Sequence, residues 1–397
     1  MLMIEGIFKF YQDNKLIAES RNNITETGRI LAIKTLLGAL PSFGSSLAIG
    51  VDSTPNTLST ISYTPTQVVV TGTTAVTATF SSHSFLPGDI ITVSGVTATG
   101  LTGINGTQTV ISITTTTISF TDSALTAGTY NTAGTIGTFS KSSGLATETQ
   151  LGFEIASTRV SSSHLASSYL YDGLVFKGTL SDPSAYKFIE AGLYADPLIS
   201  GTQNYKSETL TSFEAGDVLE TTAGAELPTS GDVTRLYTSA DSSNFRIGDS
   251  CLQVKSGGSA KINQQFFGIE KYLNTDLISL AFYAEGSGSV DITFYTDASN
   301  YSTFRFTAAS SGYKVVSVEK GSTPQASSGT IDWSNITSIE VSATGTDVLL
   351  DAIKLKVTSR LDTNNGLISR TVLPDVITKL SNTPLEIEYY LRLGFNV

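Results

Sequence analysis

The sequence contains two histidines, His83 and His164, and these are the imidazoles available to activate a serine or cysteine nucleophile. A Ser–His–Asp apparatus needs an imidazole that is oriented between a carboxylate and a nucleophile. His164 lies in the serine-rich run 161–168, where serine neighbours follow from composition alone. His83 lies beside a turn and is best interpreted as a surface histidine or one with its hydrogen bonds satisfied. We expect no catalysis at either position.

Paired carboxylates offer another route to hydrolysis, because glycosidases place two Asp or Glu side chains around the scissile bond. Here the acidic residues are scattered among serine- and threonine-rich stretches, and no run resembles such a site. Glu386 and Glu388 alternate with apolar residues, which is typical of the solvent-facing side of a strand. The sequence therefore predicts no catalytic residues and no enzyme.

The residues alone predict no bound cofactor either. Cys251 is the only cysteine, so neither an internal disulfide nor a cysteine-based zinc site can form, and its neighbours predict a buried thiol in a strand. The glycine runs at 257–258 and 286–288 lack the Lys-Ser/Thr ending of a phosphate loop. They predict hairpin turns instead.

Composition indicates a mainly β chain. Of the 397 residues 40% are hydrophobic and 15% are charged, whereas an average protein has about 25% charged residues. Ser, Thr and Gly separate short runs of Val, Ile, Phe and Tyr, which is typical of strands joined by turns. The net charge of −11 argues against a nucleic-acid partner, and no apolar run reaches the roughly 20 residues that a membrane span needs. The charged N-terminal stretch does not resemble a signal peptide.

One amphipathic helix is predicted at residues 29–40. Ile30, Ile33, Leu37 and Leu40 fall on one face of such a helix, Thr25 is a candidate N-cap, and Pro41 would end it. The final stretch at 385–395 alternates apolar and polar residues and predicts a strand. Both segments offer apolar faces that a small discontinuous domain would leave unburied, so we expect assembly contacts there.

The expected architecture is a discontinuous base domain, β with one or two helices, that carries two insertions. Base segments are predicted at 1–63, 141–211 and 358–397. Residues 64–140 contain only Asp89 and Asp122 as charged residues and are predicted to form an inserted small β-domain. Residues 212–357 contain at least seven strand-like runs and are predicted to form an inserted β-sandwich or jelly roll.

In this last region Tyr283, Tyr295, Tyr301 and Tyr313 alternate with polar residues, so about half of them should face outward, to stack on sugar rings or to contact a neighbouring subunit.

Three pieces of the expected base follow one another in a recognisable order. The first is the helix with Leu47-Ala48-Ile49-Gly50-Val51 and the turn at 52–55, and the second is the stretch 149–159 with the strand-like run 188–194. The third is 369–379 with the terminal strand. This ordered set resembles tailed-bacteriophage virion proteins of the tail, fibre or neck-associated type. The resemblance implies a homo-oligomeric virion protein that contacts other phage virion proteins and is assembled in the host cytoplasm.

The insertions carry resemblances of their own. Residues 82–96 and 103–107 resemble small β-modules of cyanobacterial and marine phage virion proteins. Residues 213–214, 248–254 and 349–355, with Trp333, are similar to carbohydrate-binding-module jelly rolls, many of which hold a structural calcium. That similarity implies Glu214 and Asp351 as calcium ligands, because calcium prefers oxygen ligands. The alternative is that both are ordinary surface carboxylates. Trp333 is the only tryptophan, at a position more often packed than exposed, so the similarity supports the fold more than a sugar ligand.

Three functions follow from these patterns. The leading one is a structural virion protein that assembles through its base and displays its β-domains outward, at the tail, neck or capsid. The alternative is a host-surface glycan- or receptor-binding protein that acts through residues 212–357. A polysaccharide depolymerase comes third, because no active-site pattern supports it.

Overall fold

The computed structural model describes residues 2–36, 44, 46–123, 125–148, 150–155, 159–164, 173–195, 208–213, 233–237, 244–248, 250–263, 265–358 and 366–395. Antiparallel strands dominate these residues, which confirms the mainly β fold class. The chain divides into two compact units, one formed by Met1–Asn56 with Glu148–Val397 and the other by Thr57–Thr147. Among the described residues, no helix has the length and apolar character to span a membrane.

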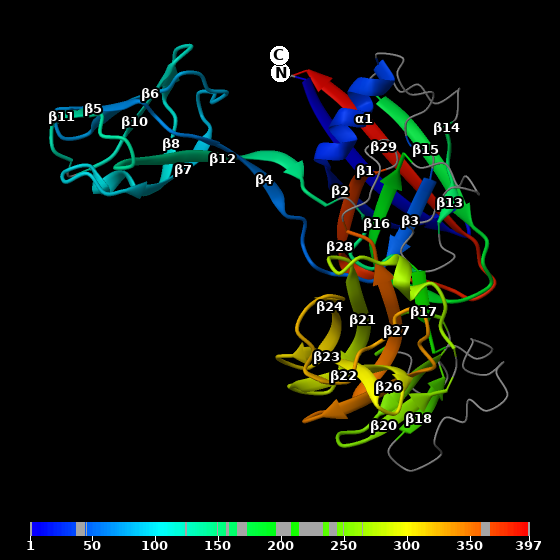
Figure 1. The fold of residues 1–397 in the computed structure, drawn as a ribbon. Coiled ribbons are helices and arrows are strands. Elements are labelled where there is room, and N and C mark those ends of the chain that lie inside the picture. The colour runs from blue at the N-terminus through cyan, green and yellow to red at the C-terminus, as the bar shows by residue number, and fades with distance from the viewer. Residues whose placement is uncertain are drawn as a thin grey trace. The chain divides into compact units, whose positions relative to one another are not determined.

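The base is a nine-stranded antiparallel sheet that draws strands from three separate parts of the chain. In order across the sheet these are β13 (Val160–Ser161), β3 (Ser46–Gly50), β16 (Tyr186–Tyr194), β28 (Leu367–Lys379), β2 (Lys15–Ile24), β1 (Leu2–Gln12), β29 (Leu385–Phe395), β15 (Gly173–Leu180) and β14 (Ser163–His164). The terminal strands β1 and β29 lie side by side over their full length (Figure 1). The alternating strand predicted at 385–395 is therefore present, and it pairs within the base.

The two ends of this strand order are consecutive in sequence. β13 pairs with β3 and β14 pairs with β15, and Ser162 alone separates them. The sheet thus closes on itself through residues 160–164. A Cβ at Gly178 in β15 would lie 2.8 Å from the Val160 side chain and 3.1 Å from that of Leu47, so glycine permits this close approach. The pairs Ser163–Lys177 and Val160–Leu47 hold the two ends of the strand order close to each other.

Aromatic side chains fill the interior of the base. Phe10 of β1 contacts Phe188 of β16 at 5.1 Å between ring centroids, and Phe8 contacts Tyr389 of β29 at 4.8 Å. Leu385, Ile387 and Tyr389 are fully buried. The expectation that this strand offers an unburied apolar face was therefore wrong, because the closed sheet covers that face within the same chain.

The predicted helix is α1 (Glu26–Leu36), and residues 37–43 lie outside the described part. Thr25 is its N-cap, as predicted, because Thr25 Oγ1 accepts a hydrogen bond of 2.8 Å from Gly28 N. Leu31 is buried, whereas Ile30 is 42% exposed. α1 packs on β28, where the Gly28 Cα lies against the backbone of Ile368.

The unit Thr57–Thr147 contains two small sheets around its own core of aliphatic and phenylalanine side chains. One sheet has the order β11 (Gly128–Tyr130), β5 (Gln67–Thr71), β6 (Ala75–Thr79), β10 (Thr117–Thr121) and β9 (Ser112–Ile113). The other has the order β4 (Leu58–Tyr63), β12 (Ile136–Ala146), β7 (Ile90–Val96) and β8 (Gly106–Thr109), with a short 3-10 helix η1 (Thr102–Ile104). Between β8 and β9 the chain passes from one sheet to the other.

The jelly-roll region packs two sheets face to face. One has the order β18 (Val233–Tyr237), β19 (Ser250–Val254), β27 (Val348–Lys356), β21 (Leu277–Ala284) and β24 (Gly312–Glu319), with β17 (Glu208–Thr211) paired to β27. The other has the order β20 (Ser259–Ile262), β26 (Ser338–Thr344), β22 (Gly288–Asp297), β23 (Asn300–Ala308) and β25 (Ala326–Ser328), and a 3-10 helix η2 (Ile269–Lys271) follows β20.

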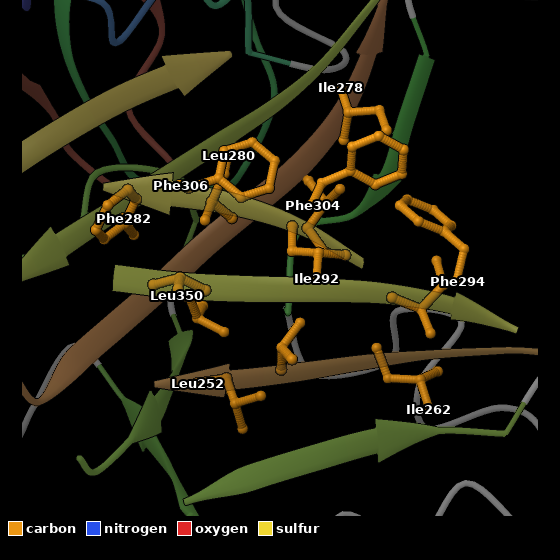
Figure 2. Packing of buried hydrophobic residues seen from close by; sticks show 14 of the residues in the cluster. Leu252, Ile262, Ile278, Leu280, Phe282, Ile292, Phe294, Phe304, Phe306 and Leu350 are labelled. Carbon is orange, nitrogen blue, oxygen red and sulfur yellow. The ribbon is translucent and has the colours of Figure 1, made fainter. Parts of the chain in front are cut away.

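The core between these sheets is large and apolar. Figure 2 shows Leu280, Ile292, Phe304 and Leu350 among the side chains that both sheets contribute. Trp333 packs on Phe294 at 5.3 Å between ring centroids, so it is a packed tryptophan as expected. Cys251 is buried, which confirms the prediction of a buried thiol.

Candidate functional site

Of the two histidines, the structure describes the side chain of His83. His83 Nδ1 accepts a hydrogen bond of 3.2 Å from Phe85 N, and its Nε2 lies 3.2 Å from Thr117 O. Its ring packs on Phe80 and Phe85, so it is a satisfied histidine. His164 is part of β14, and its side chain lies outside the described part of the structure.

The similarity to carbohydrate-binding modules implies two carboxylates as calcium ligands, Glu214 and Asp351. Glu214 lies outside the described residues. Asp351, on β27, is fully buried and accepts hydrogen bonds from Arg246 N at 2.9 Å, Ile247 N at 3.2 Å and Tyr313 Oη at 2.5 Å. Burial raises the pKa of Asp351 to about 7, although these hydrogen bonds oppose the rise. The calcium pair stays a prediction.

Metal ligands do not cluster elsewhere in the described residues, where no group of three or more His, Cys, Asp or Glu side chains could hold an ion. Glu386 and Glu388 lie on the outward side of β29, where Lys177 Nζ is 2.8 Å from Glu386 Oε1 and 3.5 Å from Glu388 Oε1. These partly exposed pairs fit the predicted solvent-facing side of a strand.

A buried ion pair joins two neighbouring strands of the base sheet, β16 and β28. Arg370 of β28 and Glu190 of β16 are 2% and 0% exposed, and Arg370 Nε lies 2.9 Å from Glu190 Oε2. The backbone N–H groups of Asp52, Gly152 and Phe153 also donate to the Glu190 carboxylate, at 3.2, 2.9 and 2.7 Å. A buried charge costs free energy unless it is paired and hydrogen-bonded, and this pair has both kinds of partner.

Arg370 also binds the segment where the first insertion leaves the base. Its Nη1 donates to Thr54 O and Asn56 Oδ1, both at 2.9 Å, and Asn56 Nδ2 donates to Arg370 O at 3.0 Å. Arg370 Nη2 lies 3.7 Å from Asp52 Oδ2. One guanidinium therefore fixes residues 52–56, which directly precede Thr57.

Two lysines of the jelly roll bond to the base segment 152–154, which also donates to Glu190. Lys354 Nζ and Lys356 Nζ, both on β27, donate to Glu154 O at 2.7 Å and to Gly152 O at 3.0 Å. Glu154 is in turn paired with Arg159 at 2.6 Å. Burial lowers the pKa of Lys354 from its ordinary value of 10.5 to about 8, against the opposing charge of Glu154.

We call Glu154, Glu190, Lys354, Lys356 and Arg370 the charged junction. Its charges are satisfied mainly by one another and by backbone groups, and Glu190, Arg370 and Lys354 are buried from solvent. Such an arrangement can hold segments together, but it presents no accessible nucleophile or acid–base pair to a substrate. Sequence reasoning missed it. The available signal was a single charge inside an otherwise apolar strand, as Glu190 is within 188–194.

A second surface lies on the outward side of the five-stranded jelly-roll sheet. Its residues alternate along β20, β26, β22 and β23 with the core residues, and we call them the tyrosine face: Lys261, Asp291, Tyr295, Tyr301, Arg305 and Glu340.

The tyrosine face is held by contacts between neighbouring strands. The rings of Tyr295 and Tyr301 lie 5.4 Å apart, and Tyr295 Oη donates to Glu340 Oε2 at 2.7 Å. Lys261 Nζ lies 3.7 Å from the centre of the Tyr295 ring. Both tyrosines are half-buried, so the prediction that some tyrosines of this region face outward is confirmed.

No family model matches the sequence, and no curated protein matches it either. Among solved structures, an agarase shares 16% identity over 40% of this chain, with a TM-score of 0.28, and the chain spans 25% of that enzyme. Two infectious bursal disease virus structures, one of the Gt strain and one of a T13 viral particle, share 13% and 10% identity over 99% of this chain and 82% and 78% of theirs, with TM-scores of 0.15 and 0.14. At such TM-scores these likenesses carry no argument about function.

Proposed function

We propose that this chain is a structural, non-enzymatic component of a tailed-phage particle that attaches through its base and displays two β-modules outward. The observation that carries the proposal is the closed nine-stranded sheet, which is assembled from three separate chain segments and bears both insertions. The strands among the pieces that resemble tailed-phage virion proteins, β3, β16, β28 and β29, all belong to this sheet. The buried charges support it too, because they serve to hold segments and not to reach a substrate.

Attachment through the base would use its outer surface. Partners would meet the polar outward side of β1, β29 and β15, which carries Lys9, Lys177, Glu386 and Tyr390. The partners would be other virion proteins and further copies of this chain in a closed cyclic ring, since such symmetry lets one gene product surround an axis.

The direct test is the protein content of purified particles of the phage that encodes this chain. Mass spectrometry should find the chain in stoichiometric amount, and an antibody against it should decorate one fixed position on every particle. A chain present in the infected cell but absent from purified particles would overturn the proposal. A reducing-sugar assay on host capsule should remain at background, and release of sugar would contradict the non-enzymatic assignment.

A second candidate function is glycan binding at the tyrosine face. The observation that favours it is the pair Tyr295 and Tyr301, half-exposed on an open sheet and flanked by charged hydrogen-bonding groups. Aromatic rings with a few fixed polar groups are the usual make-up of small-ligand surfaces. The other sheet of the jelly roll is less available, because Asp351 and Lys354 on its outward side are buried at their contacts.

A microarray of bacterial surface polysaccharides tests this candidate with the full chain. Tyr301→Ala should reduce binding of any retained glycan by about tenfold or more, because it removes one of the two rings. The control is Tyr130→Ala, a half-buried tyrosine of Thr57–Thr147 that lies outside the jelly roll. Failure to bind any glycan, or equal loss in both variants, would eliminate glycan binding and leave the structural role as the sole proposal.

A further inference from the structure

Residues 244–248 contact the jelly roll on one side and the base on the other. On the jelly-roll side, Phe245 is buried against Cys251 and Leu349. On the base side, Ile247 forms an isolated bridge with Tyr186, and Lys187 N donates to Arg246 O at 2.8 Å. This short segment therefore makes main-chain contacts with β16 while its side chains pack in the jelly roll.

The Arg246 side chain extends the same two-sided pattern. Its Nη1 donates to Val51 O in the base at 3.0 Å, and its guanidinium lies 4.1 Å from the centre of the Tyr313 ring of β24. A guanidinium stacked on a ring and bonded to a carbonyl has little rotamer freedom left. The segment is thus fixed at both surfaces by one residue.

Asp351 supplies the acceptor that gives the segment its shape. Its carboxylate receives the N–H groups of Arg246 and Ile247 and the hydroxyl of Tyr313, and no water competes because the side chain is fully buried. Removing a buried acceptor leaves its donors without partners, which costs more than the hydrogen bonds themselves contribute. The conformation of residues 246–247 therefore depends on Asp351, whose described hydrogen bonds all lie within the segment 244–248 and the jelly roll.

We propose that residues 244–248 are a clip that sets the orientation of the jelly roll on the base, and that Asp351 is the positioning residue that keeps the clip closed. Lys354 and Lys356, together with Gln150 Nε2, which donates to Val357 O, form a second attachment that shares no residue with the clip. Opening the clip should leave the jelly roll attached at these lysines and free to pivot about them. The clip is a conformational device beyond the proposed structural role, since it lets a displayed module change direction without detaching.

Amide hydrogen exchange in the full chain tests the clip, with Asp351→Ala and Arg246→Ala as variants. The amide of Lys187 reports directly, because its acceptor is Arg246 O. In Asp351→Ala it should exchange about tenfold faster or more, while amides of 290–306 in the jelly-roll core stay protected. Asp291→Ala is the matched control, since it removes a carboxylate paired with Arg305 on the opposite sheet. Unchanged exchange at Lys187 in Asp351→Ala would overturn the proposal.

A distance measurement separates a pivoting module from a local loss of order. Spin labels at Thr179→Cys in the base and Thr307→Cys in the jelly roll, both exposed positions, should give a broader distance distribution in either clip variant than in the parent chain. Asp351→Ala could also speed amide exchange at 290–306, which would indicate a loss of order in the jelly-roll core. In that case Arg246→Ala distinguishes pivoting from loss of order, because it keeps the Asp351 carboxylate and its backbone donors. A distribution as narrow as the parent's in Arg246→Ala would overturn the pivot.

Discussion

The two insertions differ in how they are joined to the chain that carries them. Thr57–Thr147 forms a compact unit with its own core, and its ends run together as the pair β4 and β12. The jelly roll belongs to the same compact unit as the base and bonds to it through Lys354, Lys356 and residues 244–248.

The difference in composition explains the difference in attachment. Few charges occur in the first insertion, and one of them, Asp89, is used within the unit by Lys141 at 2.6 Å. In the jelly roll, charged residues on β27 are buried where they meet base carbonyls. A buried charge is held to a specific partner because leaving it unpaired is costly. An inserted module whose charges pair with one another can thus fold independently of the base. A module that buries its charges against the base is held to the base by them.

The largest expected effect comes from breaking the charged junction at its centre. Arg370→Ala should lower the free energy of unfolding of the full chain by about 3 to 5 kcal/mol, because Glu190 is left buried without its partner. Urea unfolding monitored by circular dichroism measures it. Arg305→Ala, which breaks a pair whose arginine is 41% exposed, should cost at most about 1 kcal/mol. Equal decreases in the free energy of unfolding of the two variants would show that the buried pair contributes no more to stability than the exposed pair.

The next effect is a pH dependence that belongs to the coupled module alone. The lysine at 354 has a pKa of about 8 in the folded chain and an ordinary value of 10.5 when unfolded. Between these values the unfolded chain holds more protons, so the free energy of unfolding rises with pH, by about 2 kcal/mol from pH 7 to pH 9.5. Lys354→Met should reduce this rise to the part that Lys356 contributes, since burial lowers the pKa of Lys356 too, and Lys255→Met, an exposed lysine of the same module, should retain the full rise. A rise that survives in full in Lys354→Met would assign it to another group.

The smallest effect is expected from removing the independent module. Replacing Thr57–Thr147 with a short Gly-Ser linker should change the stability of the remainder by no more than about 1 kcal/mol, because Thr57 and Thr147 are already hydrogen-bonded neighbours and closing the gap costs little. The excised segment should unfold cooperatively by itself, as its own core indicates. If the shortened chain unfolds, or if the excised segment is unfolded, then Thr57–Thr147 depends on the base for its stability as the jelly roll does.

Sequence patterns predicted the elements better than their partners. The mainly β class, the Thr25 cap and the terminal strand follow from local propensity and periodicity, which act over a few residues. The packed Trp333 follows from the similarity to carbohydrate-binding modules. The sequence places the domain borders near 64 and 140, and the compact unit in the structure runs from Thr57 to Thr147.

The charged junction lay beyond such reasoning. Its members are far apart in the sequence, with Glu190 and Arg370 separated by 180 residues, and only the closed sheet brings them together. The burial of the terminal strand's apolar face was missed for the same reason, since closure through Ser162 cannot be inferred from alternation in one strand.

The central claim, that the base attaches to a particle and the insertions project from it, is tested most directly by imaging particles whose gene lacks the codons for Thr57–Thr147. We expect such particles to assemble, to contain the shortened chain in normal amount, and to differ from the parent by one peripheral density missing at each copy. Particles that fail to incorporate the shortened chain, or that lose density at the contact with neighbouring proteins, would assign assembly to the insertion and not to the base.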